Sequence, residues 1–252
     1  MNHFFLPPDS IKGDHVFFPT GTARQMAMVL RLQPGSRVLV LDGLGAAYEV
    51  VLETLSSKEA QGRVLKKQAA MNEPALSLTL QVCLTQREKF EWILQKGTEL
   101  GVRSFMPVLS ARTLEQDLKN VLSKYDRWQK ILKEAAEQCE RGKVPNLLPP
   151  ENLKTALQLD PGGLKIILYE DEQHLSLKQA LRSNKHAEHI YFLVGPEGGF
   201  AKDEVEEANQ AGYLSVSLGS RILRMETAAI TAAALVMYEF DEMGVPSDQT
   251  VG

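Results

Sequence analysis

Short hydrophobic runs separated by turn residues fill the first part of the chain. Between residues 14 and 65 these runs are rich in β-branched and aromatic side chains, a pattern that is typical of β-strands. The strands are predicted at residues 15–18, 37–41, 48–52 and 62–65, with one helix-like stretch at 22–32. Turn signals such as Pro34-Gly35 and Asp42-Gly43 separate them. Strands spaced this closely predict a small β-barrel.

After residue 74 the pattern changes to apolar runs that alternate with amphipathic segments. The apolar runs predict strands at residues 76–84, 105–109, 164–169, 190–194 and 214–218. Helical periodicity predicts helices at 89–100 and 125–140, and further helices after each of the last two strands. This alternation predicts an α/β domain with a mostly parallel sheet. The polar segment 66–74 ends in proline, so we expect two domains, residues 1–70 and 75–245.

Composition narrows the class of protein without naming a partner. The hydrophobic and charged fractions, 44% and 24%, are those of a globular protein and argue against a disordered or fibrous chain. Cys83 and Cys139 have no metal-like spacing and form no disulfide framework, so no metal is predicted. No secretory signal and no apolar run of membrane-spanning length is visible, which predicts a cytoplasmic protein. The net charge of −4 is unlike that of a generic phosphate binder, although residues 1–70 carry eight basic against six acidic residues.

Residues 39–48 begin like a dinucleotide-binding fingerprint, because a predicted strand runs into Gly43-Leu44-Gly45. The third glycine is missing, and the next segment is predicted to be a strand. A phosphate-binding loop requires a helix N-terminus at this point. We therefore favour a β-hairpin over a phosphate-binding loop.

The first segment that suggests chemistry covers residues 190–200. A buried strand runs into Gly195, a Pro-Glu pair and then Gly198-Gly199. Glycines at the carboxyl end of a strand let the backbone approach a ligand, and open α/β sheets bind ligands at that edge. A β-branched residue at Gly198 would then occupy the space of the ligand. The alternative is an ordinary tight turn between a strand and a helix.

The second such segment covers residues 216–229. A predicted strand ends at Leu218-Gly219, a short connection carries Arg221 and Arg224, and Glu226-Thr227 open a helix rich in alanine. Small side chains permit close backbone approach within one subunit or across a dimer. Packing alone explains the alanine face, but it does not explain two arginines and a glutamate on one short connection.

These segments carry a resemblance to a known family. The sequence GPEGG-F, followed about twenty residues later by LGSRILRMETAA, resembles the cofactor-binding core of the uracil-N3 methyltransferases of the SPOUT superfamily. The helices at residues 87–102 and 127–145, and the VLR motif at 29–31, also resemble those of the family, so the likeness spans nearly the whole chain. The chain departs from the family pattern at four places: His3, Arg24-Gln25, Ala201 in place of serine, and Met225 in place of threonine.

The resemblance implies a fold and an activity. The implied fold is a SPOUT α/β domain with a deep trefoil knot, preceded by a PUA-like RNA-binding β-barrel. The implied enzyme is an obligate homodimer with active sites at the subunit interface and the helix at residues 227–240 at or near that interface. The implied reaction is methylation of N3 of a uridine in 16S (small-subunit) ribosomal RNA, with S-adenosyl-L-methionine as cofactor. The partners are therefore ribosomal RNA or the assembled small subunit.

The resemblance also implies roles for particular residues. Arg224 would stabilise the developing uracil anion or orient the base, and Glu226 would act as the base or hold either the arginine or the loop in place. The implied cofactor-binding residues are Leu168, Glu170, Gly195, Glu197, Gly198, Gly199, Leu218, Gly219, Ile222, Leu223, Thr227 and Ala228. The basic residues at motif positions that could contact RNA are Arg24, Arg31, Arg87, Lys89, Arg112 and Arg141. Without the motif, each of these would be read as a solvated surface charge.

Two other functions are compatible with the same cofactor pocket. A sister SPOUT enzyme could methylate a ribose 2′-OH or a guanine nitrogen, but the VLR motif and the helix at 127–145 accompany the uracil-N3 group. A non-catalytic RNA-binding or ribosome-assembly protein could keep the fold. The intact GPEGG and RMET-A segments argue against that second alternative.

Overall fold

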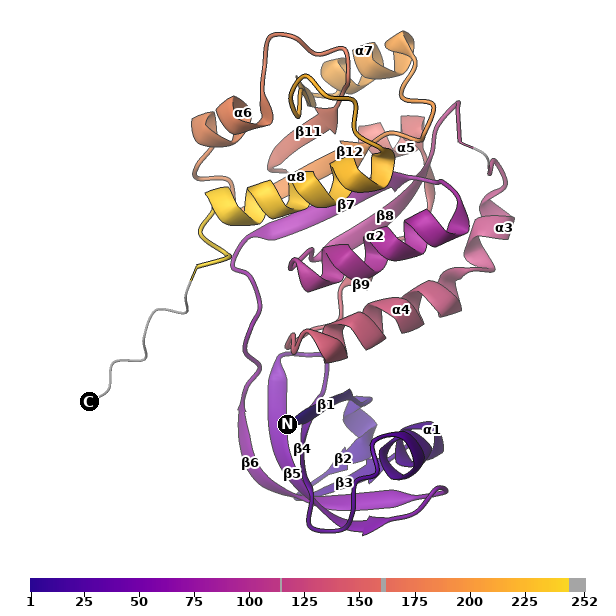
Figure 1. Cartoon of the computed structure of the whole chain (residues 1–252), viewed down its shortest axis with the longest axis vertical. Helices are drawn as coiled ribbons and strands as arrows, with labels where there is room; N and C mark the ends of the chain where they lie inside the picture. Colours follow the sequence, from indigo (N-terminus) through magenta and orange to yellow (C-terminus); the bar gives the residue numbers. More distant parts are fainter. Residues whose placement is uncertain (114, 160–161, 245–252) are drawn as a thin grey trace, which may run out of the picture. The chain divides into compact units, whose positions relative to one another are not determined.

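The computed structural model describes residues 1–113, 115–159 and 162–244. The chain forms two compact units: Met1–Glu73 with Lys133–Val144, and Pro74–Leu132 with Pro145–Gly252. Figure 1 labels the helices and strands of both units along the chain. Each unit is described separately below.

The first unit contains a six-stranded sheet with the order β1-β4-β5-β6-β3-β2. Its strands are β1 (Asn2–Phe5), β2 (Ile11–Lys12), β3 (His15–Phe18), β4 (Arg37–Leu41), β5 (Ala46–Leu55) and β6 (Ala60–Ala69). The β1–β4 pair is parallel and the other pairs are antiparallel. Register shifts in the β5–β6 pair mark bulges, which bend a sheet around its core. This six-stranded sheet is consistent with the predicted small barrel.

Residues 39–48 form a hairpin, as the sequence predicts, because β4 and β5 pair antiparallel across them. The carboxylate of Asp42 accepts hydrogen bonds from the backbone N–H groups of Leu44 and Ala46 at 2.8 and 3.0 Å and so shapes the turn. The predicted helix at 22–32 is split into α1 (Thr20–Arg24) and a π-helical turn (Gln25–Val29). Arg31, with a φ of 53°, follows that turn.

The second unit is built on a parallel sheet with the order β10-β8-β7-β12-β11-β13, and β9 pairs with β8. Its strands are β7 (Ser77–Cys83), β8 (Ser104–Leu109), β9 (Asn146–Leu147), β10 (Glu151–Asn152), β11 (Leu164–Leu168), β12 (His189–Val194) and β13 (Leu214–Val216). Every strand pair in the described part of this sheet is parallel. The predicted α/β class is therefore confirmed.

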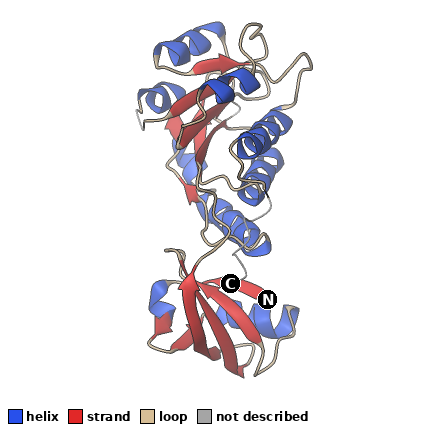
Figure 2. Cartoon of the chain, turned by 90° about the vertical axis from the view of Figure 1, so that its left-hand side faces the viewer, coloured by secondary structure: helices blue, strands red, loops and turns tan. Residues whose placement is uncertain are grey.

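Helices accompany the strands of this sheet (Figure 2). They are α2 (Arg87–Glu99), α3 (Leu118–Leu122), α4 (Tyr125–Gln138), α5 (Leu153–Gln158), α6 (Leu177–Ser183), α7 (Lys202–Gln210) and α8 (Met225–Glu239). The part of α4 from Lys133 onward is counted with the first unit. Helix α2 packs tightly on β8, since a Cβ atom at Gly97 would lie 2.8 Å from the ring of Phe105. Gly101, with a φ of 93°, follows α2 as the sequence predicts.

No helix in the described residues has the length and apolar character that crossing a bilayer requires. Within the same residues, no cluster of three or more His, Cys, Asp or Glu side chains is arranged to hold a metal ion.

The parallel sheet brings three loops to one edge. Strand β11 lies between β12 and β13, and both of these neighbours run parallel to it. The three strands end at Leu168, Val194 and Val216, so the loops that follow them leave the sheet on the same side. Ligands of open parallel sheets bind at this carboxyl edge.

Candidate functional site

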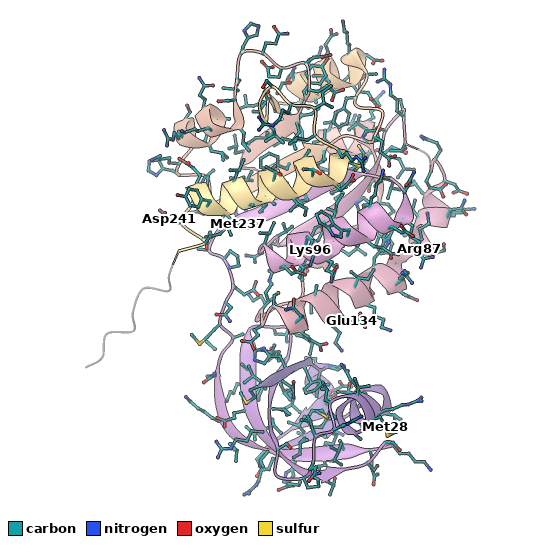
Figure 3. All side chains as sticks on the ribbon, viewed as in Figure 1. Met28, Arg87, Lys96, Glu134, Met237 and Asp241 are labelled. Atoms are coloured by element: carbon teal, nitrogen blue, oxygen red, sulfur yellow. The ribbon has the colours of Figure 1, made fainter. Side chains whose placement is uncertain are left out.

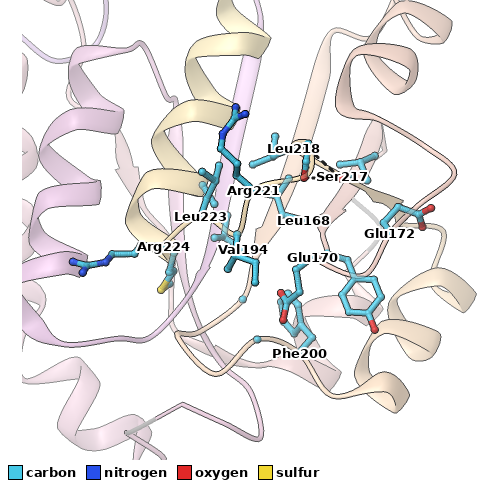
Figure 4. A pocket seen from close by; sticks show the side chains of 18 of the residues that line it. Leu168, Glu170, Glu172, Val194, Phe200, Ser217, Leu218, Arg221, Leu223 and Arg224 are labelled. Carbon is cyan, nitrogen blue, oxygen red and sulfur yellow. Dashed lines mark hydrogen bonds between the residues drawn. The ribbon is translucent and has the colours of Figure 1, made fainter.

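A cavity of about 900 Å³ lies where these three loops meet. Its walls come from the loop after β11, from residues 194–200 and from residues 216–228. Figure 4 shows that Leu168, Val194 and Leu218 come from different elements and line one pocket. The volume lies in the range of small-molecule and cofactor sites.

The loop after β12, residues 195–200 and hereafter the glycine loop, forms one wall of the cavity. Its turn is closed by a hydrogen bond of 2.9 Å from the N–H of Gly199 to the carbonyl of Pro196. Gly199 has a φ of 68°, and a Cβ atom there would lie 2.5 Å from a carboxylate oxygen of Glu170. A Cβ atom at Gly195 would lie 2.9 Å from the buried ring of Phe200. Both positions therefore require glycine or a rearrangement.

An ion pair joins the glycine loop to α2. The Nζ atom of Lys89 lies 2.5 Å from Oε1 of Glu197. The hydrogen bond from Lys89 lowers the pKa of Glu197 below its ordinary value. Glu197 is thus held as a carboxylate at neutral pH.

The connection between β13 and α8, residues 217–224 and hereafter the arginine connection, forms the opposite wall. Its first residue, Ser217, pairs with Ser176 in an isolated parallel bridge. Hydrogen bonds of 2.9 Å from Ser217 N–H to the Leu175 carbonyl and of 3.0 Å from Leu177 N–H to the Ser217 carbonyl hold this bridge. The bridge brings the segment before α6 into the cavity wall.

The later part of the arginine connection is exposed. Ile222 is 90% exposed, and both Arg221 and Arg224 lie at the surface while lining the cavity. Neither arginine forms an ion pair with any side chain that the structure describes. Their side chains point in different directions from the connection (Figure 4). Arg224 is also the N-cap residue of α8, directly before its first residue, Met225.

Glu226, in the first turn of α8, has a carboxylate oxygen that is buried and has no hydrogen-bond partner in the described residues. It lines the cavity beside Arg224, but no ion pair or hydrogen bond joins the two side chains there. The predicted role of Glu226 in holding Arg224 in place therefore has no supporting contact among the described residues. An unpaired buried carboxylate oxygen is costly and requires a donor.

Most of the cofactor-binding residues that the sequence implied are brought together in this cavity. Gly198 and Thr227 are exceptions, because neither lines it. Gly198 is exposed, and a Cβ atom there would meet only the side chain of Arg112 at 3.5 Å. Gly198 therefore lies outside the lining of the cavity, whereas Gly195 and Gly199 both belong to it.

Sequence reasoning missed one part of the cavity wall. The segment between β11 and α6 contributes residues 172–176 to the lining, and the first turn of α6 contributes Gln179. The sequence does carry a local signal for the start of α6, because Ser176 and Gln179 form a capping box there. The bridge to Ser217, which places the segment at the cavity, joins distant parts of the chain and leaves no local pattern.

The basic residues proposed for RNA binding differ in their surroundings. In the first unit, Arg24 and Arg31 are exposed and have no ion-pair partner among the described side chains, and the neighbouring Met28 is 64% exposed (Figure 3). Arg141 is only 4% exposed and pairs with Glu73 at 2.8 Å. Its guanidinium is therefore part of the interior of the first unit, which corrects its expected place on an RNA-binding surface.

The other three candidates lie in the second unit. Arg87 is exposed and pairs with Glu91 at 3.0 Å. Lys89 pairs with Glu197 of the glycine loop, as described above. Arg112 is exposed and donates a hydrogen bond of 2.7 Å from Nη1 to the carbonyl of Gly198.

Comparison with known proteins places this geometry in a family. A family model described as an RNA methyltransferase domain matches residues 72–237. A ribosomal RNA small subunit methyltransferase E from Synechocystis is 35% identical over 92% of this chain and 75% of its own length. The protein of the same name from Bacillus subtilis is 30% identical over 92% of this chain and 91% of its own.

A solved structure agrees with the sequence comparisons. The crystal structure of a ribosomal RNA small subunit methyltransferase E from Neisseria gonorrhoeae, bound to S-adenosyl methionine, matches this chain with a TM-score of 0.86 and 33% identity. The match covers 94% of this chain and 97% of that one. The parallel sheet and the cavity at its edge are thus those of an RNA methyltransferase. Within that class, the chain belongs to the ribosomal RNA small subunit methyltransferase E family.

Proposed function

We propose that this chain methylates N3 of a uridine in 16S ribosomal RNA, in the cytoplasm, with S-adenosyl-L-methionine as the methyl donor. The observation that carries the proposal is the cavity between the glycine loop and the arginine connection, in a chain of this family. The relative from Neisseria gonorrhoeae is described as bound to the same cofactor.

The residues of the cavity fit this cofactor. Apolar side chains such as Leu168 and Leu218 offer surfaces for an adenine ring, and the glycine loop allows close backbone approach. The buried carboxylate oxygen of Glu226 has no partner, and the cofactor carries N–H and O–H donors. When bound, S-adenosyl-L-methionine supplies an electrophilic methyl group. The chain itself must bind the cofactor, orient the uracil base and remove the proton from N3.

The proposed cofactor-binding residues are those of the implied set that line the cavity. They are Leu168, Glu170, Gly195, Glu197, Gly199, Leu218, Gly219, Ile222, Leu223 and Ala228. Gly198 and Thr227 are not retained as contacts, because neither lines the cavity.

Arg224 is the proposed catalytic arginine. The N3–H of uracil is a weak acid, so methylation at neutral pH requires stabilisation of the developing anion. A guanidinium stays charged at any working pH and offers a planar set of donors. Arg224 is exposed and has no ion-pair partner in the described structure, so its donors are available to a substrate.

Glu226 is the proposed acceptor for the proton on N3. Its unpaired oxygen lies in the cavity wall, two residues after Arg224 on the chain. Without a pair to the arginine, its charge is available to a donor that enters the cavity. The two side chains together would remove a proton and stabilise the anion that remains.

The RNA must present an unpaired base, because N3 lies on the Watson–Crick edge. The base must also leave its stack to enter such a cavity. We propose that the first unit, residues 1–70 above all, is a PUA-like domain that binds the RNA backbone through Arg24 and Arg31. Arg87, Lys89 and Arg112 are proposed as further phosphate contacts, and Arg141 is not.

A homodimer and a trefoil knot remain predictions of the family resemblance. The exposed side of α8 carries Leu235 and Tyr238, which are 45% and 71% exposed. Apolar side chains of this kind fit an interface between two copies. Light scattering at micromolar protein is expected to give twice the chain mass, and a monomer mass independent of concentration would contradict the dimer.

The proposed function is tested by nucleoside mass spectrometry of ribosomal RNA from a strain that lacks this protein. We expect one N3-methyluridine to be lost from the small subunit and to be restored by the purified protein with S-adenosyl-L-methionine. Persistence of every N3-methyluridine would refute the proposal. Loss of a ribose methyl or a methylguanosine instead would assign the other SPOUT chemistry.

A further inference from the structure

Behind the glycine loop lies a buried carboxylate that the proposed mechanism does not use. Glu204, in the first turn of α7, is 9% exposed and does not line the cavity. One of its oxygens accepts a hydrogen bond of 2.9 Å from the N–H of Ala201, where the family pattern has a serine cap. The other accepts a hydrogen bond of 2.8 Å from the N–H of Ala111. Both oxygens of this buried charge are thus paired, as burial requires.

The bond to Ala111 connects the loop to a distant part of the chain. Ala111 belongs to the segment after β8, and the next residue, Arg112, donates to the carbonyl of Gly198 at 2.7 Å. The segment after β8 is therefore bonded on both sides of Gly199 and Phe200, the two residues of this stretch that line the cavity. Neither Glu204 nor Arg112 lines it.

We propose that Glu204, assisted by Arg112, is a positioning residue that holds the glycine loop in the shape that binds the cofactor. The proposal rests on the assignment of the cavity to S-adenosyl-L-methionine. The physical reason is that the cofactor binds only those molecules whose glycine loop already has the competent shape. The apparent affinity therefore falls in proportion to the fraction of molecules in that shape. Without the two bonds of Glu204, that fraction falls before any cofactor is present.

The test is the Glu204→Gln variant. The amide keeps the size of the side chain but turns an N–H₂ group toward one of two backbone N–H donors. Hydrogen bonds to charged groups of this kind correspond to about a ten- to hundredfold change in an equilibrium. We therefore expect the calorimetric Kd for S-adenosyl-L-methionine to rise by about that factor, with KM raised and kcat at saturating cofactor largely kept. Glu206→Gln, an exposed change on the same helix, is the matched control and should alter neither.

A second variant separates loop positioning from helix capping. Ala201→Ser in the Glu204→Gln background supplies a hydroxyl that can cap α7 but cannot bond Ala111. We expect thermal stability to recover while the weakened cofactor binding remains. Full recovery of the Kd would show that Glu204 acts only as a cap and would overturn the proposal. Arg112→Ala, at an exposed position, should weaken cofactor binding by a smaller factor.

Hydrogen exchange gives a readout that does not depend on the cofactor. In Glu204→Gln without ligand, amides of residues 195–204 should exchange faster, while those of the arginine connection should not change. An unchanged Kd together with unchanged exchange in the folded variant would refute the positioning role. If the wild-type protein bound no S-adenosyl-L-methionine, the proposed function would fail, and faster exchange would still show that Glu204 holds the loop.

Discussion

The glycine loop and the arginine connection face the same cavity but are held in different ways. The glycine loop has an internal turn at Gly199, an ion pair from Glu197 to α2 and hydrogen bonds to the segment after β8. The arginine connection is fixed at Ser217 by the bridge to Ser176. Beyond it, no ion pair or side-chain hydrogen bond from the described residues holds Arg221 or Arg224.

The difference matches two tasks that a methyltransferase must perform. A small cofactor, which is the same in every reaction cycle, is bound best by a wall that is already in place, because little of the protein has to become ordered on binding. A base that leaves its stack in a large RNA must be bound by side chains that can move to contact it. The contrast therefore assigns the preformed wall of the cofactor site to the glycine loop and the substrate base to Arg224, although other residues of the arginine connection also line the cofactor cavity. The variants below test that assignment.

The largest effect is expected for Arg224→Ala, in the arginine connection. Single-turnover rates at saturating cofactor should fall about 10²–10³-fold, as they do when one preorganised donor to a developing anion is removed. The calorimetric Kd for the cofactor should change much less. Arg224→Lys keeps the charge without the planar fork and should restore the rate only in part. Arg221→Ala, which removes a second exposed arginine of the same connection, is the matched control.

Equal losses of rate and of cofactor affinity in Arg224→Ala would break the comparison, since Arg224 itself would then shape the cofactor site. A rate near that of the wild type would remove Arg224 from the chemistry altogether.

A smaller loss of rate is expected for Glu226→Gln. The amide keeps the size of the side chain but loses the charge of the unpaired buried oxygen. One charge-assisted hydrogen bond is worth about 1.5–3 kcal/mol, so turnover should fall about ten- to a hundredfold. Single-turnover rates at saturating cofactor, set beside calorimetric Kd values for the cofactor, provide the check. A raised Kd with an unchanged rate would show that Glu226 only binds the cofactor.

In the glycine loop, the expected loss is of affinity rather than of rate. Gly195→Ala places a Cβ atom 2.9 Å from the ring of Phe200, which is itself buried and cannot easily move. Overpacking of this kind costs about 1–3 kcal/mol, so the Kd for the cofactor should rise roughly tenfold. Gly198→Ala is the control, with a nearest contact of 3.5 Å, and should stay within about twofold of the wild type. A larger rise in Kd for Gly198→Ala than for Gly195→Ala would show that the cavity wall formed by the glycine loop is not the surface that binds the cofactor.

Much of the fold could be predicted because its elements carry strong local patterns. The strands β8, β11 and β12 are mainly apolar, β7 alternates apolar with polar residues, and the helices α2 and α4 have clear helical periodicity. Strands β9 and β10 have two residues each, which is too short for a period to form. Strand β1 pairs with β4 across more than thirty residues, so its neighbours along the chain give no sign of it.

The site shows the same limit at the level of single residues. The sequence marks Gly198-Gly199 as a pair, but only the turn geometry shows that Gly199 carries the positive φ and the close approach. The motif position of Arg141 suggests an exposed basic residue. Only the fold shows that its side chain is buried and paired with Glu73. Local pattern identifies the segments that carry chemistry, and long-range contacts decide which side chains in them are free.

The smallest effect is expected from the ion pair between Lys89 and the glycine loop. The pair lowers the pKa of Glu197, so its stabilisation is fully present above the ordinary pKa of a carboxyl group. It is lost as the pH falls through the lowered pKa. Both side chains are about one-third exposed, so Lys89→Met should lower the free energy of unfolding at neutral pH by less than about 1 kcal/mol.

Urea unfolding of the wild type and of Lys89→Met at several pH values measures this difference. The two proteins should differ at neutral pH and converge in acid, where Glu197 takes up a proton in both. Lys202→Met removes a charge from an exposed lysine at the start of α7 and should show no such convergence. A difference that persists unchanged in acid would mean that Lys89 stabilises by packing, and the glycine loop would then be held by hydrogen bonds alone.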